Sequence, residues 1–263
     1  MRSALLNVMV QAARKAARRL QRDFGEVENL QVSMKGPADF VSQADRQTEN
    51  ILVEELTRAR PGYGFLVEER GTVKGTDPDH RWIIDPLDGT TNFLHGIPHF
   101  AISIALERGD TLVAALIYNP ITDELFWAER GKGAFLNDRR LRVAARRDLS
   151  QAVVACGIPH NGRPEHALFR EELARVQAKA AGIRRFGAAS LDLAYVAAGR
   201  YDAFWERGLK PWDIAAGMLL VREAGGTVGD IDGRPDPLVT GNIMVANERI
   251  YAELEKELRA AHR

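Results

Sequence analysis

The sequence predicts a protein of mixed helices and strands, in which an antiparallel α+β half is followed by an α/β half. Three observations support this fold class. Apolar residues recur every three or four positions near the N-terminus, every second position from about residue 99, and in alternating strand-like and helix-like runs beyond about residue 150. With 263 residues, the chain can form one large domain or two small ones. We expect one half over residues 1–147 and the other over residues 148–263.

The first element is an amphipathic helix. Its apolar residues fall at helical spacing and are Leu5, Met9, Ala12, Ala13, Ala16, Leu20 and Phe24. The opposite side carries basic residues, namely Lys15, Arg18, Arg19 and Arg22. Gln11, Gln21 and Asp23 dilute this basic stripe, and no aromatic residues interleave with it. We therefore interpret the stripe as a solvated face rather than a nucleic-acid or membrane contact.

A loop, a second helix and two short strands follow. Gly36 and Pro37 predict a loop over residues 33–41. Ser42 and Asp45 have the spacing of a capping box, and Pro61-Gly62 ends the helix that begins there. The inward face of this helix consists of Ile51, Leu52, Leu56 and Ala59. Apolar runs over residues 64–67 and 82–84 predict strands, and carboxylates follow both of them.

The period of two predicts an antiparallel meander, after which strands and helices alternate. The meander strands cover residues 100–106, 111–118 and 124–128, with turns at Gly109-Asp110 and Asn119-Pro120. The second half is expected to contain strands over residues 152–157, 183–186, 201–205 and 243–246. Its helices are expected over residues 165–180, 190–198 and 213–223, with a last one from Glu248.

The composition excludes several classes of protein. Hydrophobic residues make up 45% and charged residues 27%, as in a globular protein with a real core. Lys+Arg and Asp+Glu both count 36, so the net charge does not favour a general nucleic-acid or membrane binder. The single cysteine, Cys156, excludes an intramolecular disulfide and a Cys-based zinc module, and it fits a reducing cytoplasm. No apolar run reaches the roughly 18 residues of a membrane span, so we expect a cytoplasmic protein.

The stretch from Trp82 to Phe93 carries the clearest chemical signal. An apolar strand runs into Asp85, a proline turns the chain, and Asp88 precedes Gly89-Thr90-Thr91, which can open a helix. Free N–H groups at a helix start favour an anion such as phosphate. Carboxylates beside a phosphate require cations between them, and hard divalent cations bind carboxylate and carbonyl oxygens. Asp85, the Leu87 carbonyl and Asp88 are therefore candidate Mg²⁺ ligands, and the hydroxyl of Thr90 or Thr91 could orient a water.

A simpler interpretation takes these carboxylates as structural. Asp85 and Asp88 could be turn and capping residues, Glu68 a solvated strand end, and Asp213 the N-cap of its helix. Together, however, the four carboxylates could form a site for more than one metal ion. His95 and His99 are not metal ligands on this interpretation, because Gly96 and Pro98 break any helix that would align them. The sequence contains no P-loop and no Gly-x-Ser-x-Gly motif.

Five blocks, in their order and spacing, resemble the bacterial type of the inositol monophosphatase family, which comprises Mg²⁺-dependent, lithium-sensitive phosphatases. The first signature is Asp85-Pro86-Leu87-Asp88-Gly89-Thr90-Thr91-Asn92-Phe93. The second is Lys210-Pro211-Trp212-Asp213-Ile214-Ala215-Ala216-Gly217, continuing to Glu223-Ala224-Gly225-Gly226. The secondary blocks are Lys35-Gly36 to Asp45, Glu68-Glu69, and Gly187-Ala188-Ala189-Ser190-Leu191-Asp192-Leu193-Ala194. One departure is Val67, where the family usually has glycine, so the loop before Glu68 is expected to shift slightly without losing the ligand.

The resemblance covers nearly the whole chain and implies a layered αβαβα sandwich of the sugar-phosphatase type. The metal-binding loop would lie in the half over residues 1–147, and the half over residues 148–263 would complete the active site. The resemblance also implies Mg²⁺ ligands. The activating metal would be held by Glu68, Asp85, the Leu87 carbonyl and Thr90, the second by Asp85, Asp88 and Asp213, and a weaker third by Glu68 and water.

The remaining implied roles concern the substrate. The backbone of Gly89 and Thr90 would bind phosphate, with Asp45 orienting Thr90. Glu206 would contact substrate hydroxyls, and Ala189 would line the same pocket with Asp213. Alternatively, Glu206 is structural and is an ion partner of Arg207 or Lys210.

The expected function is a Mg²⁺-dependent phosphomonoesterase acting on inositol monophosphate or a related small polyol phosphate. Metal-activated water would attack phosphorus in line, a second metal ion would stabilise the leaving alkoxide, and no protein nucleophile would be required. The alternatives are a related phosphatase for fructose bisphosphate, histidinol phosphate or a 3′-phosphonucleotide. A further alternative is a regulatory role in a transcription complex through the Arg-rich first helix and Arg184-Arg185, which the net charge of zero does not support. The resemblance also implies a homodimer and no membrane partner.

Overall fold

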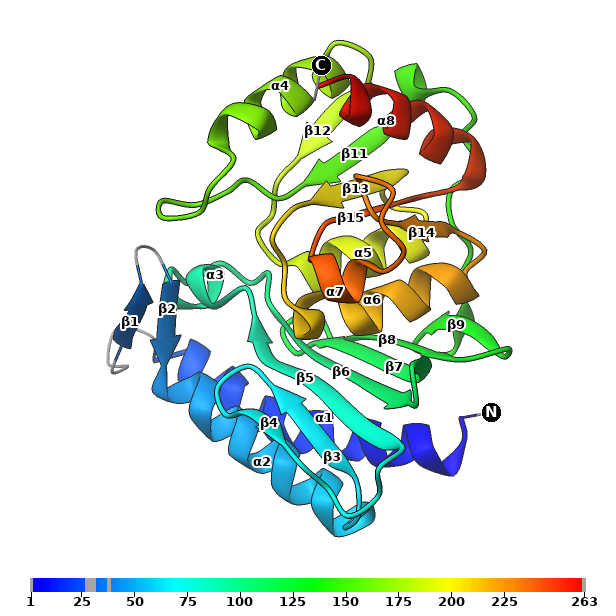
Figure 1. Cartoon of the computed structure of the whole chain (residues 1–263). Coiled ribbons are helices and arrows are strands. Elements are labelled where there is room, and N and C mark those ends of the chain that lie inside the picture. The colour runs from blue at the N-terminus through cyan, green and yellow to red at the C-terminus, as the bar shows by residue number, and fades with distance from the viewer. Residues whose placement is uncertain (1, 27–31, 37–38, 262–263) are drawn as a thin grey trace.

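The computed structural model describes residues 2–26, 32–36 and 39–261 and shows five layers, helix–sheet–helix–sheet–helix (Figure 1). The outer pair of helices on one side is α1 (Ala4–Phe24) and α2 (Gln43–Ala59), and the pair on the other side is α4 (His166–Gln177) and α8 (Glu248–Ala260). Between the two sheets lie α5 (Ala189–Ala197) and α6 (Pro211–Glu223). This arrangement confirms the predicted αβαβα class.

The larger sheet has eight strands in the order β10-β9-β8-β7-β6-β5-β3-β4. Its strands are β3 (Gly64–Val67), β4 (Gly71–Val73), β5 (His80–Asp88), β6 (Ala101–Arg108), β7 (Thr111–Asn119), β8 (Glu124–Glu129), β9 (Gly133–Leu136) and β10 (Arg139–Arg140). Neighbouring strands are antiparallel except β3 and β5, which are parallel. The predicted meander is confirmed as β6, β7 and β8, and β9 and β10 extend it beyond the prediction.

The smaller sheet has five strands in the order β12-β11-β13-β15-β14. Its strands are β11 (Val153–Cys156), β12 (Gly182–Arg184), β13 (Ala203–Glu206), β14 (Thr227–Gly229) and β15 (Ile243–Ala246). The strand β11 is parallel to both of its neighbours, whereas β15 is antiparallel to both of its own. The four predicted strands of this half are confirmed, with ends that differ by at most two residues, and β14, α7 (Pro237–Thr240) and η2 (Leu149–Gln151) were not predicted.

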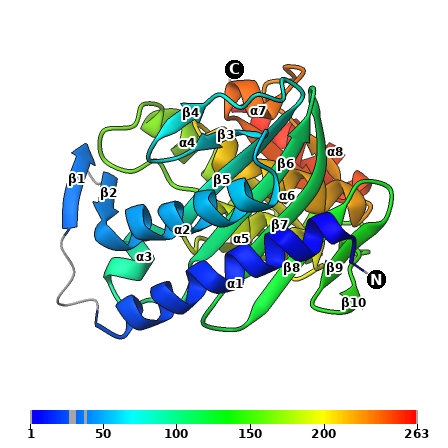
Figure 2. The same ribbon diagram turned by 90° about the horizontal axis from the view of Figure 1, so that it is seen from below.

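The first two helices pack side by side across one face of the larger sheet (Figure 2). In α1, the predicted apolar stripe is buried except at its two ends, where Leu5 and Phe24 are half-buried, and the carboxylate of Asp23 lies 2.8 Å from Arg19. In α2, Leu52 and Leu56 are fully buried, as predicted. Within the described residues, no helix is long and apolar enough to cross a membrane.

The predicted loop over residues 33–41 is wrong in extent. The strands β1 (Val32–Gly36) and β2 (Asp39–Ser42) pair antiparallel, so most of the range predicted as a loop lies in strands. Positions 37 and 38 lie outside the described residues, as does the side chain of Ser42, on which the predicted capping box depends. Asp45, the other member of that box, is buried in the first turn of α2.

The strand β6 separates two cores. Its larger side chains, such as Ile102 and Ile104, pack with α1 and α2, while the smaller Ala101 and Ala105 face α5 and α6. Small side chains allow a helix to approach a sheet closely, which fits the many contacts of α6 with β6 and β7. The core between the sheets therefore joins residues from both predicted halves, and the boundary near residue 147 stays a prediction.

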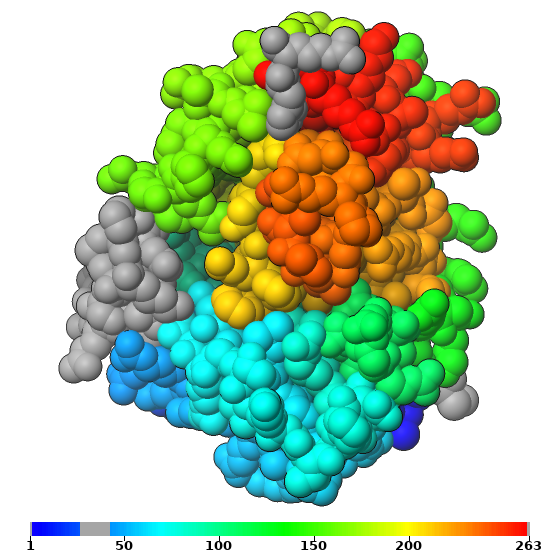
Figure 3. Space-filling view, in the orientation of Figure 1, coloured from blue at the N-terminus to red at the C-terminus, as the bar shows by residue number. Residues whose placement is uncertain are grey.

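The helices α5 and α6 touch most closely at Gly217. A Cβ atom at this position would lie 2.4 Å from the Leu193 side chain, so only glycine fits. At the same end of the molecule, the ends of β3, β5 and β13 meet the starts of α3 (Thr90–Leu94), α5 and α6. Figure 3 shows a hollow there, between the cyan, green and yellow segments.

Candidate active site

The hollow contains a cavity of about 170 Å³ into which both sheets contribute side chains. It is lined by Glu68, Asp85, Leu87, Asp88, Gly89, Thr90, Gly157, Arg163, Arg185, Gly187, Ala189, Asp192, Glu206, Leu209 and Asp213. The structure thus brings together every predicted site residue except Asp45, which lies just behind the wall.

The turn after β5 positions the first group. Pairing with β6 shifts register between Asp85 and Asp88, so the strand bulges where Pro86 interrupts it. The Leu87 N–H donates to Asp85 Oδ1 at 2.9 Å, which fixes that carboxylate. Gly89 has a φ of 91°, and a Cβ there would lie 3.0 Å from the His99 carbonyl, so the turn requires glycine. The helix α3 then begins at Thr90, as predicted.

Thr90 contacts Asp45 from a different part of the chain. Its hydroxyl lies 3.1 Å from Asp45 Oδ1 and 3.0 Å from the Leu87 carbonyl oxygen. A hydroxyl has one proton to donate, so one of these acceptors receives it at a time. Because Asp45 is buried and held by α2, it restrains the Thr90 side chain at the cavity wall.

Asp88 connects the turn after β5 to α5. Its Oδ2 accepts hydrogen bonds from the Ser190 N–H at 2.7 Å and the Ser190 hydroxyl at 2.5 Å. The carboxylate thereby lies at the positive end of that helix. Burial raises the pKa of Asp88 to about 6, while the bonds from Ser190 oppose the rise.

Asp213 is not the N-cap of its helix, so that simpler interpretation is wrong. The helix α6 begins two residues earlier because Pro211 suits its first position, and Lys210 is the N-cap. Asp213 occupies the third position, where its Oδ2 accepts from the Lys210 N–H at 2.7 Å. Burial, followed by the charge of Asp88, raises the pKa of Asp213 well above its usual value.

The four carboxylates repel one another across the cavity. After burial, the charges of Glu68, Asp88 and Asp213 raise the pKa of Asp85 well above its usual range. A cation would relieve this repulsion, and four carboxylates with a backbone carbonyl supply the oxygen ligands that Mg²⁺ binds. Among the described residues, no three acidic, histidine or cysteine side chains are gathered as a ready ligand group. The donor set therefore fits Mg²⁺ in chemistry and charge.

Glu206, at the end of β13, forms the opposite wall. Its carboxyl group occupies the space beside Gly157, where a Cβ would lie 1.8 Å from Glu206 Cδ. Arg207 turns away and lies 2.8 Å from Glu172 and 3.0 Å from Asp232, so the structure does not pair it with Glu206. Burial raises the pKa of Glu206 to about 7, and the charge of Arg163 opposes this most strongly.

Sequence reasoning missed part of this wall. Arg163, Gly157 and Asp192 were not singled out, and Arg185 was considered only as a partner contact. Arg163 lies in a loop with no periodic pattern, so no local signal indicates where it points. Asp192 had a detectable signal, because a charged residue falls within the apolar run of α5. His99 is half-buried and packs edge-on against Tyr195, so it is a packing residue.

Comparison with known proteins gives one consistent result. Residues 1–263 match the model of the inositol monophosphatase family. An inositol-1-monophosphatase of Mesorhizobium japonicum is 64% identical over 258 residues, which are 98% of this chain and 97% of that protein. The Nus factor SuhB of Escherichia coli is 42% identical over 97% of this chain and 96% of its own length. The crystal structure of extragenic suppressor protein suhB from Bartonella henselae is 61% identical, with a TM-score of 0.96, and the match covers 98% of this chain and 99% of that one.

Proposed function

This chain belongs to the inositol monophosphatase family, and from that premise we propose how its cavity performs the family's reaction. The protein is a phosphoric monoester hydrolase that acts on inositol monophosphate or a related small polyol phosphate. The family depends on Mg²⁺ and is sensitive to lithium in general. The single observation that carries the assignment of the site is the convergence of four carboxylates, from three separate segments, on one cavity.

We propose that the Mg²⁺ ligands are Glu68, Asp85, the Leu87 carbonyl, Asp88 and Asp213, with Thr90 at the activating metal. Bound there, Mg²⁺ would neutralise the phosphate and lower the pKa of a coordinated water. Both hydrogen bonds from Ser190 use Oδ2 of Asp88, so ligation through Oδ1 would keep the contact between β5 and α5. Lithium would act at the second metal position, because Li⁺ suits carboxylate oxygens but carries less charge.

The phosphate and the alcohol of the substrate would bind at different walls. The N–H groups at the start of α3, at Gly89 and Thr90, would hold the phosphate oxygens. Asp45 would restrain the Thr90 hydroxyl so that it orients a water. Glu206 would accept hydrogen bonds from substrate hydroxyls, with Ala189 beside it. No protein nucleophile takes part in this proposal.

A screen of small phosphate esters with Mg²⁺ tests the substrate. The panel contains inositol 1-phosphate, glycerol 2-phosphate, fructose 1,6-bisphosphate, histidinol phosphate and a 3′-phosphonucleotide. We expect the highest kcat/KM for inositol 1-phosphate. A clear preference for another member would identify the alternative phosphatase instead.

The oligomeric state and location are also proposals. Ile97 and Phe186 are 47% and 43% exposed, and the backbone of each is hydrogen-bonded to Asn92. We propose a homodimer, as the family resemblance implies, with these two exposed apolar side chains at its interface. Sedimentation at equilibrium would test it. A reducing cytoplasm suits the single, buried Cys156.

A second, regulatory function is supported by the relative named Nus factor SuhB. A binding role independent of hydrolysis would survive the loss of activity. A pull-down from lysate should therefore capture the same partner with wild-type protein and with Asp88→Asn. Capture of no protein by either would contradict this second function.

A further inference from the structure

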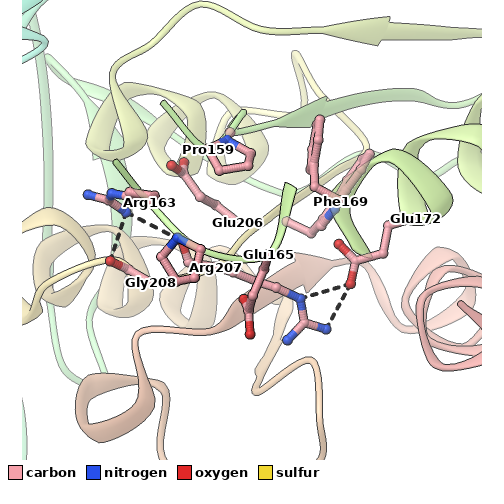
Figure 4. Close-up of a pocket in the computed structure, with 11 residues that line it drawn as sticks. Pro159, Arg163, Glu165, Phe169, Glu172, Glu206, Arg207 and Gly208 are labelled. Carbon is pink, nitrogen blue, oxygen red and sulfur yellow. Dashed lines mark hydrogen bonds and ion pairs between the residues drawn. The ribbon is translucent and has the colours of Figure 1, made fainter. Parts of the chain in front are cut away.

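A second, smaller cavity lies behind Glu206. Its volume is about 40 Å³, and it shares Gly157, Arg163 and Glu206 with the catalytic cavity. Figure 4 shows the Arg163 and Glu206 side chains on the same side of this pocket, with the Arg207 side chain extending the other way. The two cavities are thus divided by one acidic and one basic side chain.

Arg163 is anchored to the backbone immediately after Glu206. Its Nη1 donates to the Gly208 carbonyl oxygen at 2.8 Å and to the Arg207 carbonyl oxygen at 3.4 Å (Figure 4). Gly208 has a φ of 71°, a conformation that favours glycine in this turn. The position of the Arg163 guanidinium therefore depends on the end of β13 as well as on its own loop.

A histidine fixes the other side of the guanidinium. Arg163 Nε donates to His160 Nε2 at 3.0 Å, and His160 Nδ1 lies 2.8 Å from the Asn161 carbonyl oxygen. These two contacts assign the proton of neutral His160 to Nδ1, because Nε2 must accept. The guanidinium is held at three points before any substrate binds.

Among the cationic side chains near Glu206, Arg163 has the largest electrostatic effect on its carboxyl group. Arg207, the adjacent residue in sequence, is engaged with Glu172 and Asp232. Arg163 has a larger effect than Arg185 in lowering the pKa of Glu206, and Asp88 acts in the opposite direction. Without Arg163, less positive charge would offset the repulsion between the Glu206 and Asp88 carboxylates.

We propose that Arg163 is a positioning residue for Glu206: by binding the carbonyl groups of Arg207 and Gly208, it fixes the turn at the end of β13 and so directs the Glu206 carboxylate toward the hydroxyls of the substrate. The inference rests on the proposed function of Glu206. It predicts that Arg163 contributes to the choice of alcohol and not to the cleavage of the phosphate ester.

The test compares two substrates in three variants. Arg163→Met removes the charge and the donors, Arg163→Lys retains the charge, and Arg175→Met is a matched control on the exposed face of α4. Steady-state kinetics with Mg²⁺ use inositol 1-phosphate and phenyl phosphate, whose alcohol carries no further hydroxyl. We expect Arg163→Met to raise KM for inositol 1-phosphate about three- to tenfold, which lies in the lower part of the range of coupling between neighbouring residues. Its kcat, and its KM for phenyl phosphate, should change by less than about twofold. Arg163→Lys should recover part of the loss, and Arg175→Met should resemble wild type.

A double-mutant cycle with Glu206→Gln separates this inference from the function on which it rests. If Glu206→Gln affects both substrates equally, the proposed function of Glu206 is wrong. If Glu206→Gln is selective but Arg163→Met affects both substrates equally, or neither, the role of Arg163 is wrong. The proposal requires that, in the Glu206→Gln background, Arg163→Met raise KM for inositol 1-phosphate little further. A thermal melt shows whether Arg163→Met is folded. If it is not, Arg163→Lys provides the test. A rise in KM for inositol 1-phosphate but not for phenyl phosphate would support the proposal, and wild-type selectivity would overturn it.

Discussion

The two sheets contribute to the cavity in different ways. The larger sheet supplies the turn from Asp85 to Thr90, six consecutive residues whose geometry is fixed by a bulge, a proline and one glycine. The smaller sheet supplies Glu206 and two loops, one carrying Gly157 and Arg163 and the other Arg185, and these three segments are distant from one another in sequence. Two of the four carboxylates thus come from one local turn, whereas the wall proposed to recognise the alcohol is assembled from several segments. Substitutions in the two regions should accordingly change different kinetic constants.

The largest expected effect is on the turn after β5. Asp88→Asn preserves a side-chain oxygen for the Ser190 N–H but removes the charge that the second metal ion requires. We expect kcat to fall by at least two to three orders of magnitude, because several kcal/mol of charge stabilisation are lost. Turnover with saturating Mg²⁺ measures this, and circular dichroism checks the fold. Near-normal turnover in a folded variant would remove Asp88 from the metal site.

A smaller and selective effect is expected on the opposite wall. Glu206→Gln should raise KM for inositol 1-phosphate about 5- to 150-fold, which corresponds to the cost of about 1–3 kcal/mol when a buried polar group loses its hydrogen-bond partner. Phenyl phosphate should be affected much less, since its alcohol offers no hydroxyl to Glu206. Equal changes for both substrates would mean that Glu206 is structural and that the difference between the two walls does not hold.

Because its proposed ligands come from separate segments, metal binding should raise the thermal stability of the whole chain. A ligand at one hundred times its dissociation constant stabilises the native state by about 2.7 kcal/mol. For a chain of this size, excess Mg²⁺ should therefore raise Tm by about 5–10 °C relative to EDTA. Asp213→Asn should reduce this shift, because an amide oxygen can still accept from the Lys210 N–H but lacks the charge. An unchanged wild-type Tm would show that the carboxylates do not form one metal site in the resting enzyme.

The smallest expected effect is a pH dependence of the metal-free protein. The pKa of Asp88 is raised to about 6, and those of Asp85 and Asp213 are raised as well. An acid with a raised pKa contributes stability that is present below its unfolded pKa of about 4 and is lost as pH rises through the folded value. In EDTA, Tm should therefore fall by a few degrees between pH 5 and pH 7.5, and Asp88→Asn should flatten this slope. A Tm in EDTA that rises over this range would contradict the predicted sign.

The contrast between the regions also explains what could be predicted from the sequence. The turn from Asp85 to Thr90 is contiguous, so its strand, proline and glycine can be recognised without knowing the fold. The approach of Asp45 to Thr90 was predicted only through a family resemblance, since α2 and α3 are distant in sequence. Arg163 could not be placed, because its position depends on carbonyl groups of a turn some 45 residues later.

Similar reasons explain which helices and strands were predicted correctly from the sequence. The meander was predicted well because β6 alternates large and small side chains that face two different cores. The pairing of β1 and β2 was missed because glycine and proline mark a turn but do not reveal whether its flanks pair. Asp213 was misplaced by three residues within its helix because proline and aspartate both signal a helix start.

The close contact at Gly217 has a consequence for the spacing of the carboxylates. Gly217 lies one helical turn after Asp213 on the same side of α6, and Leu193 lies three residues after Ser190, which binds Asp88. The separation of Asp88 and Asp213 is therefore set by a position one turn beneath the cavity that has no side chain at all. Even a single methyl group at that position would push α5 and α6 apart. The distance between the Asp88 and Asp213 carboxylates would then increase, although every polar residue of the site is still present.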